Sequence, residues 1–275
     1  MNDDVINDVM QDFEERLKSP ALQKIVKQAK GKNANFNIAN RYALEVNKAL
    51  NASLKKYASA NDVEMKFDVL SQFFGEGLKR EHDLISQVTS IVQTRINKRA
   101  DVGLKPIKPT FNADKVRGLT KYFTRNPYDA DVINELILKR IHEYTDNFAM
   151  SVVDDAIHDN AEFHNDAGLK ATITRIASPD ACEWCANLAG VYDYEDVKET
   201  GNPVFMRHRQ CTCEVLYSCE KNRYSNVHDK RTEYDTEQVN RMIQYSRATN
   251  AEFFSKDAKQ RRIDLAKSLE KRLKR

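Results

Sequence analysis

The chain has 275 residues, of which 41% are hydrophobic and 31% are charged, with only 8 glycines and 6 prolines. This composition is typical of helices with wide solvated faces, and it excludes a turn-rich β-sandwich. The net charge of +3 is the balance of 44 basic and 41 acidic residues. A balance this even gives no general signal for binding to nucleic acid or to membranes.

The distribution of apolar residues predicts no membrane partner. No apolar run approaches the roughly 18 residues that a spanning helix needs. The N-terminus, Met1-Asn2-Asp3-Asp4, is acidic and no long apolar stretch follows it, which argues against a secretory signal. We therefore expect the protein to be made and used in a cytosol. Because thiols stay reduced there, clustered cysteines are interpreted as a metal site before they are interpreted as disulfides.

Apolar residues recur at helical spacing along most of the first two-thirds of the chain. The predicted helices cover residues 3–18, a short stretch from Pro20 to near Gly31, and residues 37–57, 62–99 and 129–165. Gly75 and Gly77 interrupt the fourth pattern and predict a kink or a break. Pro106 and Pro109 predict a connection over residues 101–110.

The pattern changes after Gly168, where alternating and β-branched residues predict short strands. The predicted fold is mainly α with a small α+β zinc-binding module, an elongated helical N-terminal part and a helical C-terminal tail. The predicted strands cover residues 170–176, 191–194 and 212–217. The predicted divisions are a helical N-terminal region (1–105), a helical linker region (110–167), a Cys/His zinc module (168–220) and a helical basic tail (221–275).

Four of the five cysteines and one histidine form two neighbouring groups. Cys182 and Cys185 form a C-x-x-C pair, and His208, Cys211 and Cys213 follow as H-x-x-C-x-C. Zinc prefers tetrahedral sulfur and nitrogen ligands, and structural sites often combine two such loops. The sequence therefore predicts one structural Zn²⁺ per chain, which would supply folding free energy to a module too small to bury much core.

Five candidate ligands compete for four positions, so one is surplus. Cys182 and Cys185 are the firmest choices because they share one tight turn. Cys211 and Cys213 would complete a four-cysteine site if they lie on one face of a strand, and His208 would then support them from outside. His208 with one of these two cysteines is the other solution. Cys219 lies outside the cluster and receives no role.

Other interpretations of these residues stay open. The cysteines could be buried apolar residues without a metal, or a redox pair, although a redox pair does not need the second group. A catalytic zinc would need an open position and a general base, for which Glu183 and Glu214 are only neighbours in sequence. Trp184 is interpreted as a local core residue that packs the C-x-x-C turn, and His158 and His164 as part of an exposed polar face.

Residues around both groups resemble the cysteine module of minor capsid proteins from tailed phages of Gram-positive bacteria. The resemblance lies in the segments Arg175 to Tyr194 and Arg207 to Tyr217. The chain is similar, more distantly, to the head-morphogenesis family typified by protein F of phage Mu, in which a His-Pro-x-Cys-Arg-Cys element follows the C-x-x-C. Arg209 and Thr212 stand where that family has proline and arginine. The resemblance is specific over about residues 168–217.

The resemblance implies a structural virion protein, present in few copies inside the head near the portal vertex, and in the host cytoplasm during assembly. Its implied partners are the portal protein and the major capsid protein. Such proteins help head assembly, and in some phages they leave with the DNA. The alternative is a zinc-stabilised nucleic-acid-binding protein acting in the host cytoplasm.

The end of the chain is basic, with nine Lys or Arg and three Asp or Glu in residues 256–275. One interpretation is a solvated amphipathic helix that packs on a neighbour. The other is contact with packaged double-stranded DNA, since clustered positive charge releases phosphate counterions. The candidate DNA-binding residues are Lys259, Arg261, Arg262, Lys267, Lys271, Arg272, Lys274 and Arg275. No phosphate loop, nucleophile elbow or catalytic carboxylate pair is recognisable, so we do not expect an enzyme.

Overall fold

A computed structural model describes residues 2–60, 67–125, 135–179, 181–199, 201–208, 211 and 213–219. Over these residues the protein is mainly helical with one small three-stranded sheet. No helix of the described part is long and apolar enough to cross a bilayer. The predicted helical tail, 221–275, lies outside the described residues.

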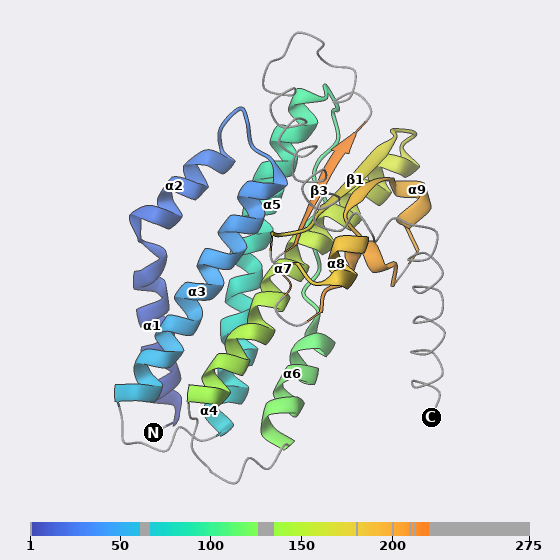
Figure 1. Ribbon diagram of the computed structural model, residues 1–275. Coiled ribbons are helices and arrows are strands. Elements are labelled where there is room, and N and C mark those ends of the chain that lie inside the picture. The colour runs from blue at the N-terminus through green and yellow to red at the C-terminus, as the bar shows by residue number, and fades with distance from the viewer. Residues whose placement is uncertain are drawn as a thin grey trace, which may run out of the picture.

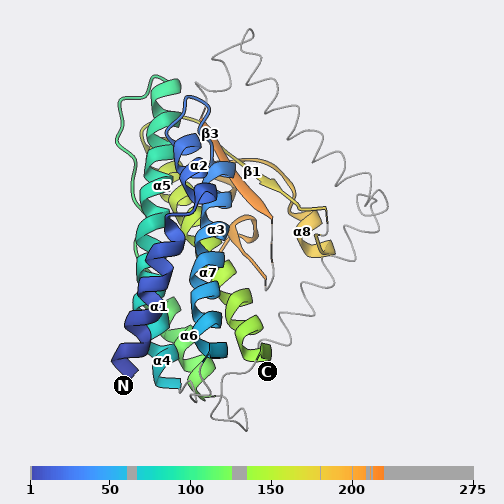
Figure 2. The same ribbon diagram turned by 90° about the vertical axis from the view of Figure 1, so that its left-hand side faces the viewer.

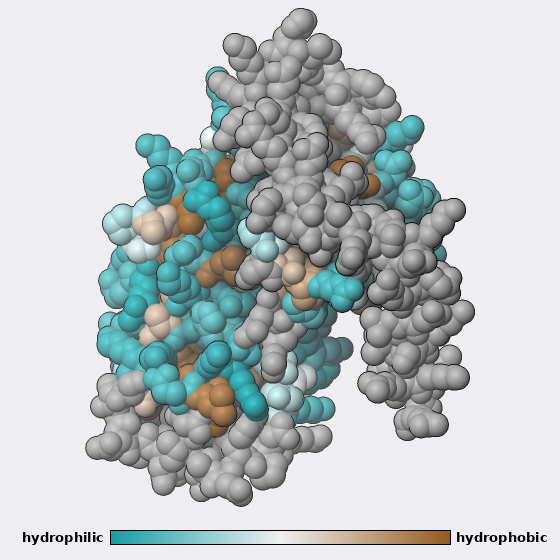
Figure 3. Space-filling model, viewed as in Figure 1, coloured by the Kyte–Doolittle hydropathy of each residue, from teal (hydrophilic) through white to brown (hydrophobic). Residues whose placement is uncertain are grey.

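Four long helices, α1 (Asn2–Leu17), α3 (Phe36–Ala60), α5 (Leu78–Arg99) and α7 (Glu135–Asp166), run side by side in both views of the chain (Figures 1 and 2). The shorter α2 (Pro20–Ala29) packs on α3, and α4 (Phe67–Gln72) packs on α6 (Ala113–Arg125). Their apolar stripes meet in one core that continues into the sheet. Figure 3 shows a mostly hydrophilic surface on this face, with small separate apolar patches among the described residues.

The helix boundaries follow capping chemistry that the sequence carries. The Ser19 hydroxyl oxygen accepts a hydrogen bond from the Leu22 amide at the start of α2, and Pro20 occupies its first turn. The α7 helix is followed by Gly168 at a φ of 79°, a conformation that glycine adopts without strain. The Ser19 cap and Pro20 explain why the predicted start of α2 agrees with the structure.

At the predicted interruption around Gly75 and Gly77 the helix changes its type, while the backbone remains helical. A π-helical turn, Phe73–Gly77, separates α4 from α5. A methyl group on Gly77 would meet the Cδ1 atom of Leu50 at 3.2 Å, whereas one on Gly75 would meet nothing within 4 Å. Gly77 therefore allows the turn to approach α3 closely.

The helix α6 was not predicted as a separate element. Its start is marked by Asn112, whose side-chain oxygen accepts a hydrogen bond of 2.9 Å from the Lys115 amide. Val116 and Phe123 are its buried residues. This cap and the spacing of the apolar residues are present in the sequence, and α6 lies within the predicted helical linker region, 110–167.

The sheet has the order β2-β1-β3, and β1 pairs antiparallel with both neighbours. Its strands are β1 (Ala171–Ile176), β2 (Gly190–Asp193) and β3 (Glu214–Cys219). The third strand begins at Glu214, whereas the pattern predicted residues 212–217, so Cys211 and Cys213 precede the described strand. The short helices α8 (Glu183–Asn187) and α9 (Tyr194–Val197) and a 3₁₀ turn, Pro203–Phe205, lie in the connections.

The sheet is attached to α3 and α7 by specific contacts. Asn37 donates a hydrogen bond of 2.6 Å to the Glu214 carboxylate, and Phe36 meets the Tyr217 ring edge to face with centroids 6.4 Å apart. His164 at the end of α7 hydrogen-bonds the Tyr217 hydroxyl and is fully buried. The expectation that His164 lies on an exposed face is therefore wrong. The sheet is packed against the helical core rather than tethered beside it.

Candidate metal centre

The five candidate ligands are contributed by two connections at one end of the sheet. Cys182 is the N-cap residue of α8, and Cys185 lies within that helix. His208, Cys211 and Cys213 lie in the loop before β3. Because Ile176 at the end of β1 pairs with Glu214 at the start of β3, the two connections emerge side by side. The sheet register therefore brings the two sequence groups together.

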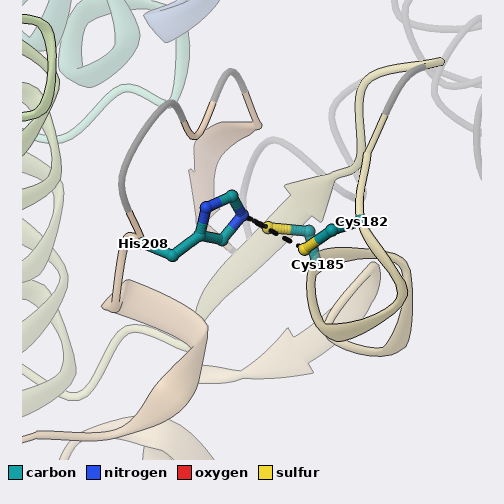
Figure 4. Close-up of side chains that lie close together, drawn as sticks. All are labelled: Cys182, Cys185 and His208. Atoms are coloured by element: carbon teal, nitrogen blue, oxygen red, sulfur yellow. Dashed lines mark hydrogen bonds between the residues drawn. The ribbon is translucent and has the colours of Figure 1, made fainter. Parts of the chain in front are cut away.

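Figure 4 shows the His208 ring directed at the sulfur atoms of Cys182 and Cys185. Its Nε2 atom lies 3.2 Å from the Cys182 Sγ atom and 2.9 Å from the Cys185 Sγ atom. The Cys185 Sγ atom is also 3.6 Å from the Cys211 Sγ atom. Two triads result, Cys182–Cys185–His208 and Cys185–Cys211–Cys213, each with its ligand atoms within 4.8 Å of one another. The other four predicted ligands thus gather around Cys185.

The sulfur–sulfur separation suits one tetrahedral ion, and the two sulfur–nitrogen separations are shorter than such an ion would set. With zinc–sulfur bonds of about 2.3 Å, two thiolate ligands lie roughly 3.8 Å apart, and a sulfur and an imidazole nitrogen lie roughly 3.6 Å apart. The 3.6 Å between the Cys185 and Cys211 sulfurs matches this geometry. Cys185, Cys211 and Cys213 are buried, Cys182 is exposed, and all are free thiols. The donor set is therefore soft, preorganised and mostly shielded from water.

His208 is held in place through its backbone. Its carbonyl oxygen accepts a hydrogen bond of 2.9 Å from the Asn147 side chain on α7 and one of 3.2 Å from the Cys211 amide. The Trp184 ring packs edge to face against the imidazole, with centroids 5.8 Å apart. Trp184 is 38% exposed. It therefore packs locally, as predicted, but as a cover over the cluster and not as a core residue.

A buried arginine on β1 contacts two of the sulfurs. The Arg175 side chain is fully buried, and its Nη2 atom lies 3.8 Å from the Cys185 Sγ atom and 3.7 Å from the Cys211 Sγ atom. Its Nη1 atom donates to the Val204 carbonyl, and the guanidinium stands 5.6 Å from the centroid of the Trp184 ring. A guanidinium stays protonated in proteins, so its position favours thiolate sulfur.

A second arginine joins the loop to α7. The Arg207 guanidinium forms a double hydrogen bond with the Asp154 carboxylate, the second at 2.9 Å, and both side chains are 4% exposed. The same guanidinium donates to the Cys213 carbonyl at 2.6 Å and lies 3.9 Å from the Cys211 Sγ atom. The ion pair therefore fixes the segment that carries His208 and Cys211 onto the helical core.

Hydrogen bonding favours the thiolate form of one cysteine, Cys211. Hydrogen bonds from the Cys185 and Cys213 side chains, together with the positive charge of Arg207, hold the pKa of Cys211 well below its ordinary value. The hydrogen bond to Cys211 raises the pKa of Cys185. Cys211 is therefore the sulfur that this environment most favours as a thiolate.

The chemistry of this donor set fits zinc. Thiolates and neutral imidazoles are the ligands of structural zinc sites, and neighbouring groups that hydrogen-bond these ligands hold them in position. The alternative interpretation, that the cysteines are buried apolar residues without a metal, is weaker because two arginines contact the sulfurs. The Glu214 carboxylate, one possible general base, binds Asn37 on α3. The contacts therefore favour a structural site over a catalytic one.

Sequence reasoning found the donors but missed the residues that support them. Arg175 and Arg207 flank the two groups, and their charge was not connected with the cysteines. Arg175 stands at a buried position of a strand, where an arginine is rare without a partner, and this signal could have identified it. Asp154 is 53 residues from Arg207, and nothing local predicts their pairing.

The remaining predicted residues do not join the cluster. His158 is half-buried near the Lys198 carbonyl, at 3.4 Å, and the Tyr194 hydroxyl, at 3.3 Å. Cys219 ends β3 and is buried in the main core. The eight candidate DNA-binding residues between Lys259 and Arg275 lie outside the described residues.

Comparison with known proteins gives one match. The model of a family described as VG15 protein matches residues 31–248, which include most of the helical core and all five candidate ligands. No curated protein and no solved structure matches the chain.

Proposed function

Because the chain belongs to the VG15 protein family, a family of phage proteins, we propose that it is a minor capsid protein that acts inside the phage head near the portal vertex. The proposed partners are the portal protein and the major capsid protein, and the proposed role is in head assembly. The supporting observation is that the family match spans both the helical core and the cysteine loops. The motif resemblance to minor capsid proteins covers the same loops.

The cysteine cluster takes a structural role in this proposal. One Zn²⁺ per chain would be held by donors from Cys182, Cys185, His208, Cys211 and Cys213. The ion would join the β1–α8 connection to the loop before β3, which together form a small apolar cluster separate from the main core. The contacts of Arg207 with Asp154 and of the His208 carbonyl with Asn147, both on α7, would then transmit this order to the helical core. The proposal therefore assigns no catalytic role to these residues.

Analysis of purified particles tests the placement. Phage virions and empty procapsids, purified through density gradients, should both contain the protein at low copy number. Cross-linking followed by mass spectrometry should join it to the portal protein. Its absence from both kinds of particle, with abundant protein in the lysate, would contradict the proposed role.

A DNA-binding role of the basic end can be separated from scaffolding. The full chain and a variant lacking residues 256–275 are compared for binding to double-stranded DNA at rising salt. Salt-sensitive binding that disappears with the deletion, together with absence from particles, would favour a zinc-stabilised nucleic-acid-binding protein of the host cytoplasm. Presence in particles with no DNA binding supports a purely structural role.

A further inference from the structure

The buried charge of Arg175 constrains which donors bind the metal. Its guanidinium is fully buried, and within the described part of the chain no carboxylate pairs with it. Its Nε atom has no hydrogen-bond partner among those residues. A buried positive charge is costly unless a negative charge balances it. The nearest candidates are the two sulfurs that its Nη2 atom contacts.

The other arginine at the cluster is already balanced. Arg207 forms a double hydrogen bond with Asp154, and both side chains are equally buried, so the pair carries no net charge. Among the described residues, the metal cluster therefore faces one positive charge that no carboxylate balances, that of Arg175. A neutral interior requires the metal and its ligands together to carry one negative charge.

Only one thiolate count meets this requirement for a divalent ion. Four thiolates around Zn²⁺ would carry two negative charges, and two thiolates would carry none. Three thiolates carry one, and the fourth ligand must then be neutral. His208 is the neutral donor among the five, and its Nε2 atom lies 2.9 Å and 3.2 Å from the Cys185 and Cys182 sulfurs.

The arginine contacts also distinguish the surplus cysteine. The guanidinium groups approach the sulfurs of Cys185 and Cys211, but at Cys213 Arg207 binds the carbonyl oxygen instead. Cys182 shares a triad with His208 and Cys185, whereas Cys211 and Cys213 both belong to the triad without the imidazole. The choice between Cys211 and Cys213 therefore rests on the arginine contacts, since both guanidinium groups approach the Cys211 sulfur.

We propose that Cys182, Cys185 and Cys211 as thiolates and His208 as a neutral imidazole bind the zinc ion, with Arg175 as the counter-charge that positions this set. Cys213 lies next to the cluster and is the cysteine left out of the ligand set. This assignment rests on the structural zinc site proposed above, and it selects one of the ligand sets that the sequence left open.

X-ray absorption at the zinc edge of the wild-type full chain tests the ligand set without any substitution. The expected first shell is three sulfurs and one nitrogen. Four sulfurs would overturn this assignment while leaving the structural zinc intact. A purified chain that contains no zinc would overturn the zinc site itself, so the two failures are distinguishable.

Matched variants test the individual roles through zinc affinity and the visible spectrum of the cobalt-loaded chain. Cys213→Ser should retain the wild-type zinc affinity and the full thiolate-to-cobalt charge-transfer intensity, whereas Cys211→Ser should lose about one-third of that intensity. Equal losses in the two variants would contradict the assignment. Circular dichroism first establishes that each variant is folded.

The role of Arg175 is tested by changing its charge. Arg175→Gln should weaken zinc binding about 10- to 100-fold, the range typical of groups that support metal ligands, and Arg175→Lys should restore part of the affinity. The cobalt spectrum should keep its three-thiolate intensity in Arg175→Lys. An unchanged zinc affinity in folded Arg175→Gln would refute the counter-charge role.

Discussion

Replacement of Asp154 by asparagine should destabilise the protein strongly. Asp154 and Arg207 are each 4% exposed and share a double hydrogen bond, so the substitution leaves a buried guanidinium without its counter-charge. Breaking a buried pair on one side costs about 3–5 kcal/mol. That is a large fraction of the roughly 5–15 kcal/mol by which proteins of this kind are stable. Zinc affinity should fall as well, because Arg207 precedes the ligand His208.

Urea denaturation of the zinc-loaded chain, followed by circular dichroism, measures this loss. Asp159→Asn is the matched control, because Asp159 lies on the same helix, is 34% exposed and is paired with His158 at the longer distance of 3.9 Å. The control should change the free energy of unfolding by less than about 1 kcal/mol. The joint replacement Asp154→Leu with Arg207→Met should recover much of the loss, since no charge is left buried. An Asp154→Asn variant as stable as the control would refute the reasoning.

Three further predictions follow from the helical core and the metal. Burial, and then the charge of Asp146, raises the pKa of Glu81 well above 4.5, so its stabilising contribution is present below about pH 4.5 and is lost as pH rises through the raised value. Denaturation at increasing pH should therefore show a steeper loss of stability in the wild type than in Glu81→Gln, and parallel curves would contradict this. Gly77→Ala should be less stable than Gly75→Ala by about 1 kcal/mol or more, and should melt at a lower temperature, because only the former crowds Leu50. Equal melting temperatures would contradict this and would show that Leu50 on α3 shifts to accept the methyl group. Chelation of zinc should lower the melting temperature of the full chain, and adding zinc back should restore it. A melting temperature that does not respond to chelators would argue against a structural ion.

The mainly helical fold was predictable because apolar residues recur at helical spacing and the boundaries carry caps. Ser19 with Pro20, and the glycines of the π-helical turn, are local signals that act where they stand in the sequence. The three strands were also predicted, since β-branched alternation marks them. The start of the third strand was two residues off, because Thr212 and Cys213 continue the alternation before the described ladder begins.

The donors of the candidate site were predictable because thiol and imidazole groups at short spacing have few other uses. Their balance of charge was not predictable, because it depends on residues far apart in the sequence. Asp154 meets Arg207 only when α7 packs against the loop, and Arg175 meets Cys211 only through the sheet register. The burial of His164 likewise requires β3 to lie across the end of α7. Tertiary contacts of this kind produce no periodic pattern in the sequence from which they could be predicted.

The metal content of the purified full chain tests the central claim most directly. Elemental analysis of protein produced without added metal and dialysed free of loose ions should find about one zinc per chain. The gathering of five soft donors around Cys185 predicts this value. A folded chain that contains neither zinc nor another divalent ion would contradict the account.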